Sequence, residues 1–323
     1  IYLRSYYIFY FFSIAYKGVI NLNITEALNS MPCDQYLRHR LCEYIIDKYF
    51  FISCAPIGKS VLGRTIECYT IGNKPKKALL CGAFHGMEWI TASLLYTFII
   101  NISEAIINHK PLANKKIWEL LSERSLCVIP CVNPDGVEIS INGSGSAGKL
   151  RDYIELVSGG DTLHWQSNAL GVDLNHNFNA DWESVKKKEI ALGITSPSKT
   201  RYGGERPESE AETIVLTKFC RSSKICSAIA FHSQGEEIYW DFGCRTPKCS
   251  LELAQDMAEL SGYTVAQPES IATGGGFKDW VIEELGVPAF TVEVGKGENP
   301  LDISQLSDIY SKTEGIMVKS LIM

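Results

Sequence analysis

The feature that most constrains this chain is a regular alternation of short apolar runs with longer segments of helical periodicity. The predicted strands are residues 63–72, 78–84, 125–134, 225–233 and 289–294. The predicted helices are residues 33–49, 88–106, 208–221, 250–262 and 304–322. Strands separated by long helices form βαβ units, so we expect a largely parallel sheet that is covered by helices on both faces.

Length and composition fit one large domain. The chain has 323 residues, of which 46% are hydrophobic and 21% are charged, as in ordinary globular proteins. We therefore predict an α/β fold, with a single α/β/α domain built on a mixed, mostly parallel twisted sheet. Residues 31–323 are assigned to this domain, and residues 1–30 to an N-terminal extension of uncertain status.

The extension contains "YYIFYFFSIAY" (residues 6–16), which is apolar for only eleven residues. That length is too short to cross a bilayer, so no stable membrane span is expected. Arg4 before it fits the apolar part of a signal peptide, but no small-x-small cleavage pattern follows. A start at Met31 is an equally open interpretation. We expect a cytoplasmic protein, or a secreted one if residues 1–30 act as a signal peptide.

The net charge indicates which partners are unlikely, and the cysteine content indicates the redox state of the compartment. The net charge is -6 and no cluster of Lys and Arg stands out, which argues against nucleic acid as a partner. The 11 cysteines are an odd number and form no CxxC pair. This usage predicts free, mostly buried thiols in a reducing compartment.

Three predicted strands end in residues that can bind or serve a metal. His85 follows the strand at 78–84 and Glu88 opens the next helix, while His232 and Glu293 stand near the ends of two later strands. In open α/β sheets such strand ends gather at one edge. Two imidazoles and a carboxylate form a catalytic zinc set that leaves one position for water. His85 alone also fits a solvated loop residue, and an HxxE pair alone is a weak pattern.

Glu293 strengthens the metal hypothesis. It follows the apolar strand residues Ala289, Phe290 and Val292, where an ionised carboxylate is costly unless it is paired or has a chemical role. A glutamate beside a metal can take a proton from the attacking water. The alternative is a rim residue bonded to the start of a helix.

Five motifs occur in the order found in one family. They are "HGMEW", "NPDG", "GVDLNHNF", "AFHS" and "TVEVG", and the similarity extends from about Cys54 to the C-terminus. In this the chain resembles the zinc carboxypeptidase A-like family. The resemblance implies a metallopeptidase with one Zn²⁺ ion that is bound by His85, Glu88 and His232, with Glu293 as the general base.

The chain departs from that family where the substrate is held. Asn175 is followed by His176 instead of an arginine, which weakens the expected clamp on a terminal carboxylate. Gln166 takes the place that looks equivalent to the family's oxyanion arginine, and Arg151 is the alternative cation for that role. Ser270 is nearest to the position of the family's mobile tyrosine.

Lys278 is a gain relative to the family. It precedes Asp279 and Trp280, where the family keeps the residue at the bottom of its specificity pocket. A cation there predicts an acidic group on the substrate, and the alternative is an exposed lysine at the start of a helix. Glu236 and Glu237 are expected either to contact an amino group of the substrate or to form a polar strand edge.

The stretches "GVDLNHNF", "HSQGEEIYW" and "GGGFKDW" resemble those of a bacterial branch that cleaves γ-D-glutamyl–diaminopimelate bonds. The resemblance implies a peptide or muropeptide substrate, which would be held by Asn175, His176, Lys278 and Gln166. One alternative is a carboxypeptidase that removes C-terminal residues, acidic ones among them, from ordinary peptides. Another is a non-catalytic binder of peptidoglycan fragments.

Overall fold

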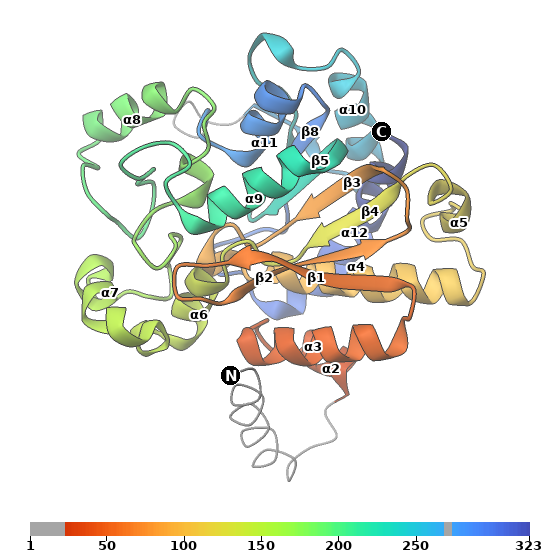
Figure 1. The fold of residues 1–323 in the computed structure, drawn as a ribbon, viewed down its shortest axis with the longest axis horizontal. Coiled ribbons are helices and arrows are strands. Elements are labelled where there is room, and N and C mark those ends of the chain that lie inside the picture. The colour runs from red at the N-terminus through yellow and green to blue at the C-terminus, as the bar shows by residue number, and fades with distance from the viewer. Residues whose placement is uncertain (1–22, 268–272) are drawn as a thin grey trace.

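The computed structural model describes residues 23–267 and 273–323, and its centre is one mixed sheet (Figure 1). Within the described residues the strand order is β1-β2-β4-β3-β5-β8-β6-β7. The strands are β1 Ile52–Lys59, β2 Thr65–Ile71, β3 Lys76–Cys81, β4 Ser125–Ile129, β5 Lys224–His232, β6 Glu237–Tyr239, β7 Thr264–Val265 and β8 Ala289–Glu293. The β3–β4, β3–β5, β5–β8 and β6–β7 pairs are parallel, and the other pairs are antiparallel. The predicted mixed, mostly parallel sheet is confirmed.

Helices cover both faces of this sheet, as expected. The longer ones are α3 Gln35–Lys48, α4 Ile90–Ile107, α8 Trp182–Ala191, α9 Ala211–Ser222, α10 Ser250–Ser261 and α12 Leu306–Lys319. The shorter ones are α2 Ile24–Leu28, α5 Ile117–Leu120, α6 Pro134–Asn142, α7 Arg151–Ser158 and α11 Phe277–Trp280. Strand β3 shows why helices are needed on both faces of the sheet. Ala78 and Leu80 point to one face and join the core that includes residues of α3, α4 and α12. Leu79 and Cys81 point to the other face and join the core that includes residues of α9 and α11.

The sequence pattern missed the short strands β6 and β7 and also β1, the longest of the three. Strand β1 is an edge strand that pairs antiparallel with β2, and the pairing is irregular between Pro56 and Gly58. Proline and glycine both weaken a strand pattern and are tolerated at edges and bulges. The continuous apolar run that identified the central strands is therefore absent here.

The described part of the predicted extension belongs to the domain. Ile24, Ala27 and Leu28 of α2 are buried in the same core as α3 and α4. The interpretations of residues 6–16 as an apolar leader lie outside the described residues.

The segment Gly86–Ile107 is apolar and long enough to cross a membrane by length and composition. However, 72% of its most apolar window is buried inside the domain. Packing between the sheet and neighbouring helices accounts for its apolar character.

Candidate active site

The sheet brings three predicted site residues to one edge. Parallel strands β3, β5 and β8 are neighbours, so their carboxyl ends lie together. His232 is the last residue of β5 and Glu293 is the last residue of β8, and the two are direct partners in the parallel ladder. His85 lies in the turn that follows β3.

This turn has a backbone packing that only glycine permits. Gly86 begins the short 3-10 turn that ends at Glu88, and a side-chain carbon on Gly86 would overlap the carbonyl of Gly136. The Gly86 N–H donates to the carbonyl of Gln166 at 3.0 Å. The turn is thus fixed against two other segments, and it holds His85 and Glu88 on the same side.

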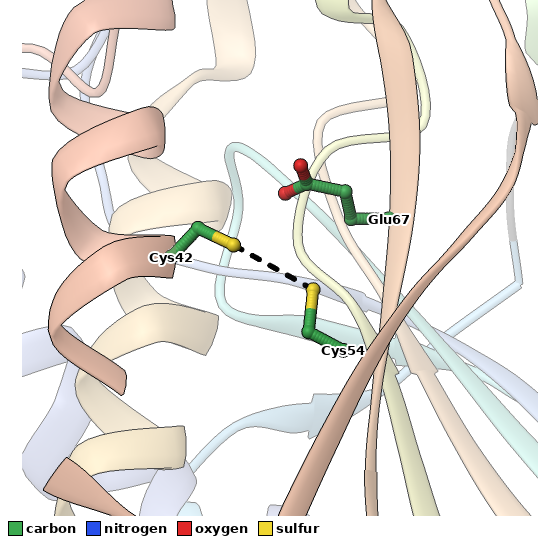
Figure 2. Close-up of side chains that lie close together, drawn as sticks. All are labelled: Cys42, Cys54 and Glu67. Atoms are coloured by element: carbon green, nitrogen blue, oxygen red, sulfur yellow. Dashed lines mark hydrogen bonds between the residues drawn. The ribbon is translucent and has the colours of Figure 1, made fainter. Parts of the chain in front are cut away.

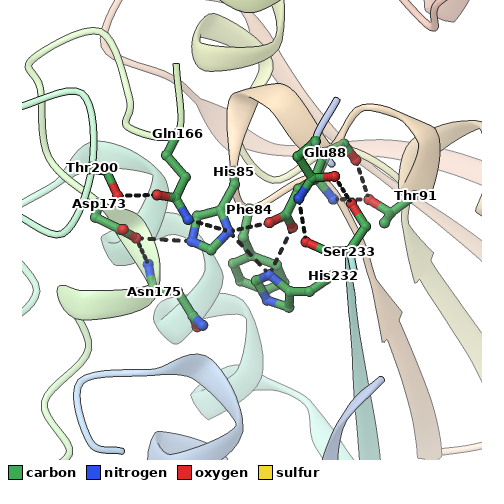
Figure 3. Close-up of polar contacts among 12 residues, drawn as sticks. Phe84, His85, Glu88, Thr91, Gln166, Asp173, Asn175, Thr200, His232 and Ser233 are labelled. Carbon is green, nitrogen blue, oxygen red and sulfur yellow. Dashed lines mark hydrogen bonds and ion pairs between the residues drawn. The ribbon is translucent and has the colours of Figure 1, made fainter. Parts of the chain in front are cut away.

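The ligand atoms of three residues converge (Figure 3). His85 Nδ1 lies 2.8 Å from Glu88 Oε1, and His232 Nδ1 lies 3.0 Å from Glu88 Oε2. The two Nδ1 atoms are 3.3 Å apart. A tetrahedral zinc ion with Zn–N bonds of about 2.05 Å separates two nitrogen ligands by about 3.3 Å. His85, Glu88 and His232 therefore fit Zn²⁺ in both donor type and spacing.

Asp173 orients His85 from behind. Its Oδ1 lies 3.0 Å from His85 Nε2, so His85 Nδ1 faces the metal group. The carboxylate is held by the backbone N–H groups of Asn175 and Arg201, each at 3.0 Å. Such support of a metal-binding histidine is common. Sequence reasoning did not assign Asp173, although it lies inside the "GVDLN" motif, two residues before Asn175.

The electrostatics of this edge favour a cation. Burial would raise the pKa of Glu88, but the imidazoles of His85 and His232 outweigh it and lower this pKa to about 2. Burial, followed by the charge of Glu88, holds the pKa of Glu293 well above its usual range. Glu237 adds to this effect, since it is the ladder partner of Glu293 on β6. Three carboxyl groups thus gather where a divalent metal ion would offset most of their negative charge.

Two of the predicted substrate-binding residues lie beside the metal group (Figure 3). Gln166 Nε2 is 3.4 Å from His85 Nδ1, and its Oε1 accepts a hydrogen bond from the hydroxyl of Thr200. The amide is therefore oriented with its N–H groups toward the metal group. Asn175 Oδ1 accepts from the backbone N–H of Phe277 at 3.0 Å, so Nδ2 is the atom that it can offer to a ligand.

The two other predicted substrate-binding residues have partners of their own. His176 is buried, and its Nδ1 lies 3.0 Å from the carboxylate of Glu189. Lys278 is only 5% exposed, which rules out the alternative of an exposed lysine. Its ammonium forms an ion pair with Asp279 and donates to the carbonyl of Asp241 at 2.6 Å. The Lys278 charge is thus already compensated, as the adjacent aspartate in the sequence could have indicated.

The remaining candidates divide between the site and the surface. Glu237 borders the site through its pairing with Glu293, whereas Glu236 forms ion pairs with Lys296 and Lys312. Arg151 is exposed at the first position of α7. The prediction for Ser270 lies outside the described residues.

Comparisons with known proteins agree with this geometry. The family described as zinc carboxypeptidase matches residues 41–314. Gamma-D-glutamyl-L-diamino acid endopeptidase 1 of Lysinibacillus sphaericus is 35% identical over 277 residues, which cover 84% of this chain and 68% of the relative.

Solved structures show a similar fold. Thrombin activatable fibrinolysis inhibitor aligns with a TM-score of 0.72 and 20% identity, over 95% of this chain and 78% of that one. The murein-tripeptide amidase of Escherichia coli O157 aligns with a TM-score of 0.52 and 19% identity, over 83% of this chain and 92% of that one.

Proposed function

We propose that this chain, which belongs to the zinc carboxypeptidase family and is a zinc metallopeptidase, hydrolyses γ-D-glutamyl–diaminopimelate bonds in peptidoglycan-derived peptides. One observation carries the substrate class: the 35% identity, over 84% of this chain, to a relative named as a γ-D-glutamyl-L-diamino acid endopeptidase.

In the proposed mechanism His85, Glu88 and His232 hold the zinc ion. When bound there, zinc supplies a Lewis acid for the scissile carbonyl and lowers the pKa of water to roughly 7. Glu293 takes the proton of the attacking water and returns it to the leaving amine. Its pairing with His232 in the strand ladder supports this role.

Gln166 is proposed to donate a hydrogen bond to the oxyanion. Thr200 holds the amide oxygen, so the N–H groups are oriented before substrate binds. A glutamine brings no charge, and it therefore acts only as an oriented dipole where the family uses an arginine. Electrostatic stabilisation of this kind depends on pre-orientation more than on charge alone.

The acidic and amino groups of the substrate have candidate partners. An ammonium has three donors, so Lys278 can keep Asp279 and the Asp241 carbonyl and still donate once to a substrate carboxylate. Asn175 Nδ2 is a second candidate donor, because the Phe277 N–H occupies its Oδ1. Glu237 borders the base Glu293 and is proposed to accept from the free amino group of diaminopimelate.

The test is a mass-spectrometric digest of two matched tripeptides. L-Ala-γ-D-Glu-diaminopimelate and L-Ala-L-Glu-L-Lys are incubated with the purified protein, with and without a zinc chelator. We expect release of diaminopimelate from the first peptide alone, and the chelator should abolish it.

Other outcomes would contradict the proposal. Release of lysine from the second peptide, with the first left intact, would favour an ordinary carboxypeptidase. No cleavage of either peptide by protein with bound zinc would favour a binder of wall fragments.

A further inference from the structure

Outside the active site, the described residues contain a second group of metal-ligating side chains (Figure 2). Cys42 lies on α3, Cys54 on the edge strand β1, and Glu67 on β2. Their ligand atoms all lie within 4.8 Å of one another. Cys54 pairs with Tyr69 in the ladder, so Glu67, two residues before Tyr69, points to the same face of the sheet. Helix α3 brings Cys42 onto that face.

The distance between the sulfur atoms fits coordination. Cys42 Sγ and Cys54 Sγ are 3.7 Å apart in a thiol–thiol hydrogen bond, and neither cysteine forms a disulfide. A tetrahedral zinc ion with Zn–S bonds of about 2.3 Å separates two sulfur ligands by about 3.8 Å. A disulfide would need about 2.05 Å. The two sulfurs are therefore spaced as ligands of one ion.

Glu67 offers a third ligand atom to this group. Tyr69 donates its hydroxyl to Oε2 at 3.2 Å, which leaves Oε1 for a metal. The carboxylate forms no ion pair with any described residue, although it is half-buried. All three side chains are partly exposed, so an ion can enter and a water molecule can complete four-coordination.

We propose that Cys42, Cys54 and Glu67 bind a second Zn²⁺ ion, which fastens α3 to the β1–β2 edge of the sheet. Binding converts both thiols to thiolates and releases two protons to solvent, so the affinity falls as the pH falls. The proposed role is structural, because the three ligands come from three separate elements, α3, β1 and β2, which one ion would hold together.

Cobalt spectroscopy tests this site separately from the active site. The active-site ligands include no sulfur, so a thiolate-to-cobalt charge-transfer band reports only the second group. Protein purified in reductant is loaded with Co²⁺ and its metal content is measured. We expect two ions per chain and a thiolate band in the natural sequence.

Variants of the two groups show which residues produce the thiolate-to-cobalt band. The double variant His85→Ala/His232→Ala should keep one ion and the full band. Cys42→Ser/Cys54→Ser should lose the band and one ion while it keeps peptidase activity. The matched control Cys244→Ser/Cys249→Ser replaces two exposed cysteines and should keep both ions.

Several results would overturn the proposal. One ion per chain with no thiolate band is one of them, and a band that survives in Cys42→Ser/Cys54→Ser is another. A Cys42–Cys54 disulfide that persists in reductant also excludes the site. If the double serine variant fails to fold, Glu67→Gln keeps both thiols and should weaken Co²⁺ binding at least tenfold; unchanged binding there would count against Glu67 as a ligand.

Discussion

The molecule presents two groups of three metal-ligating side chains in opposite surroundings. His85, Glu88 and His232 are all buried at the carboxyl end of the central strands. Cys42 and its two neighbours are half-buried at the outer edge of the sheet. The first group has a carboxylate behind one of its histidines, an aromatic ring stacked on the other and a possible base beside it, whereas the second group has one tyrosine behind its glutamate.

The difference indicates what each site is built for. The His232 ring stacks on Phe84 with the ring centroids 5.2 Å apart, and His85 is held by Asp173. Ligands that are fixed in this way are typical of sites where geometry controls a reaction. The edge group joins three separate elements and has little other support, which suits an ion that contributes stability.

The largest expected effect comes from removing the proposed base. Glu293→Gln should lower kcat about 10²–10⁴-fold and leave the zinc content unchanged, because the amide cannot accept the proton. The measurements are steady-state kinetics and metal analysis. Glu236→Gln is the control, since Glu236 bonds to Lys296 and Lys312, and its kcat should change less than about twofold. Retained turnover in Glu293→Gln would remove Glu293 from the mechanism.

Glu212 is a buried carboxyl group that belongs to neither metal-ligating group. It tests how a buried carboxyl behaves where no metal site is proposed beside it. Burial raises the pKa of Glu212 from 4.5 to about 7. The folded state therefore holds this proton more tightly than the unfolded state. The resulting stabilisation is complete below about pH 4.5 and is lost as the pH rises through 7.

Glu212→Gln should remove that dependence. Between pH 4.5 and pH 8 the natural sequence should lose on the order of 3 kcal/mol more unfolding free energy than the variant. Urea denaturation at both pH values measures the difference. Parallel loss in the two proteins would show that Glu212 titrates normally.

Asp173→Asn tests the support of the first group. It should weaken active-site zinc binding about 10–100-fold, because the amide no longer favours the correct tautomer and orientation of His85. Metal competition assays measure the affinity, and the thiolate band of the edge group should stay unchanged. An equal loss at both groups would indicate a general change in the fold.

Tyr69→Phe is the corresponding change at the edge group and should have the smallest effect. It removes the hydroxyl that, among the described residues, donates to Glu67. Loss of one such hydrogen bond corresponds to about threefold to tenfold weaker metal binding. Cobalt titration followed by the thiolate band measures it. An effect as large as that of Asp173→Asn would mean that the two groups are supported alike.

Much of the fold could be predicted because the central strands are buried on both faces. Runs such as that in β3 need no tertiary information to be identified as strands, and the long helices repeat apolar residues at a clear period. The edge strand β1 escaped because Pro56 and Gly58 interrupt its pattern. Its position depends on pairing with β2, which a local pattern does not contain.

The convergence of His85, Glu88, His232 and Glu293 was also predictable, since strand order places strand ends together. The partners of the neighbouring residues were not. The ion pair of Lys278 with Asp279 and the contact of His176 with Glu189 depend on which way each side chain turns after packing. The Cys42–Cys54 pair escaped for a similar reason, because a helix packed on a strand brings the two thiols together and no short motif records it.

The strand ladder also determines the spacing of the functional side chains. His232, Glu293 and Glu237 stand on three adjacent strands as successive partners, so each step across the sheet is about 4.8 Å. The backbone positions of the metal ligand, the proposed base and the next acid are therefore fixed at this interval. Replacing one of these side chains by a longer or shorter one moves its functional group by about a bond length. Moving the whole set along its strands requires a register shift of one residue, and such a shift would turn the side chains to the opposite face of the sheet. Single substitutions can therefore adjust the distances in this centre by small amounts, whereas the backbone spacing of its residues can change only by whole strand positions.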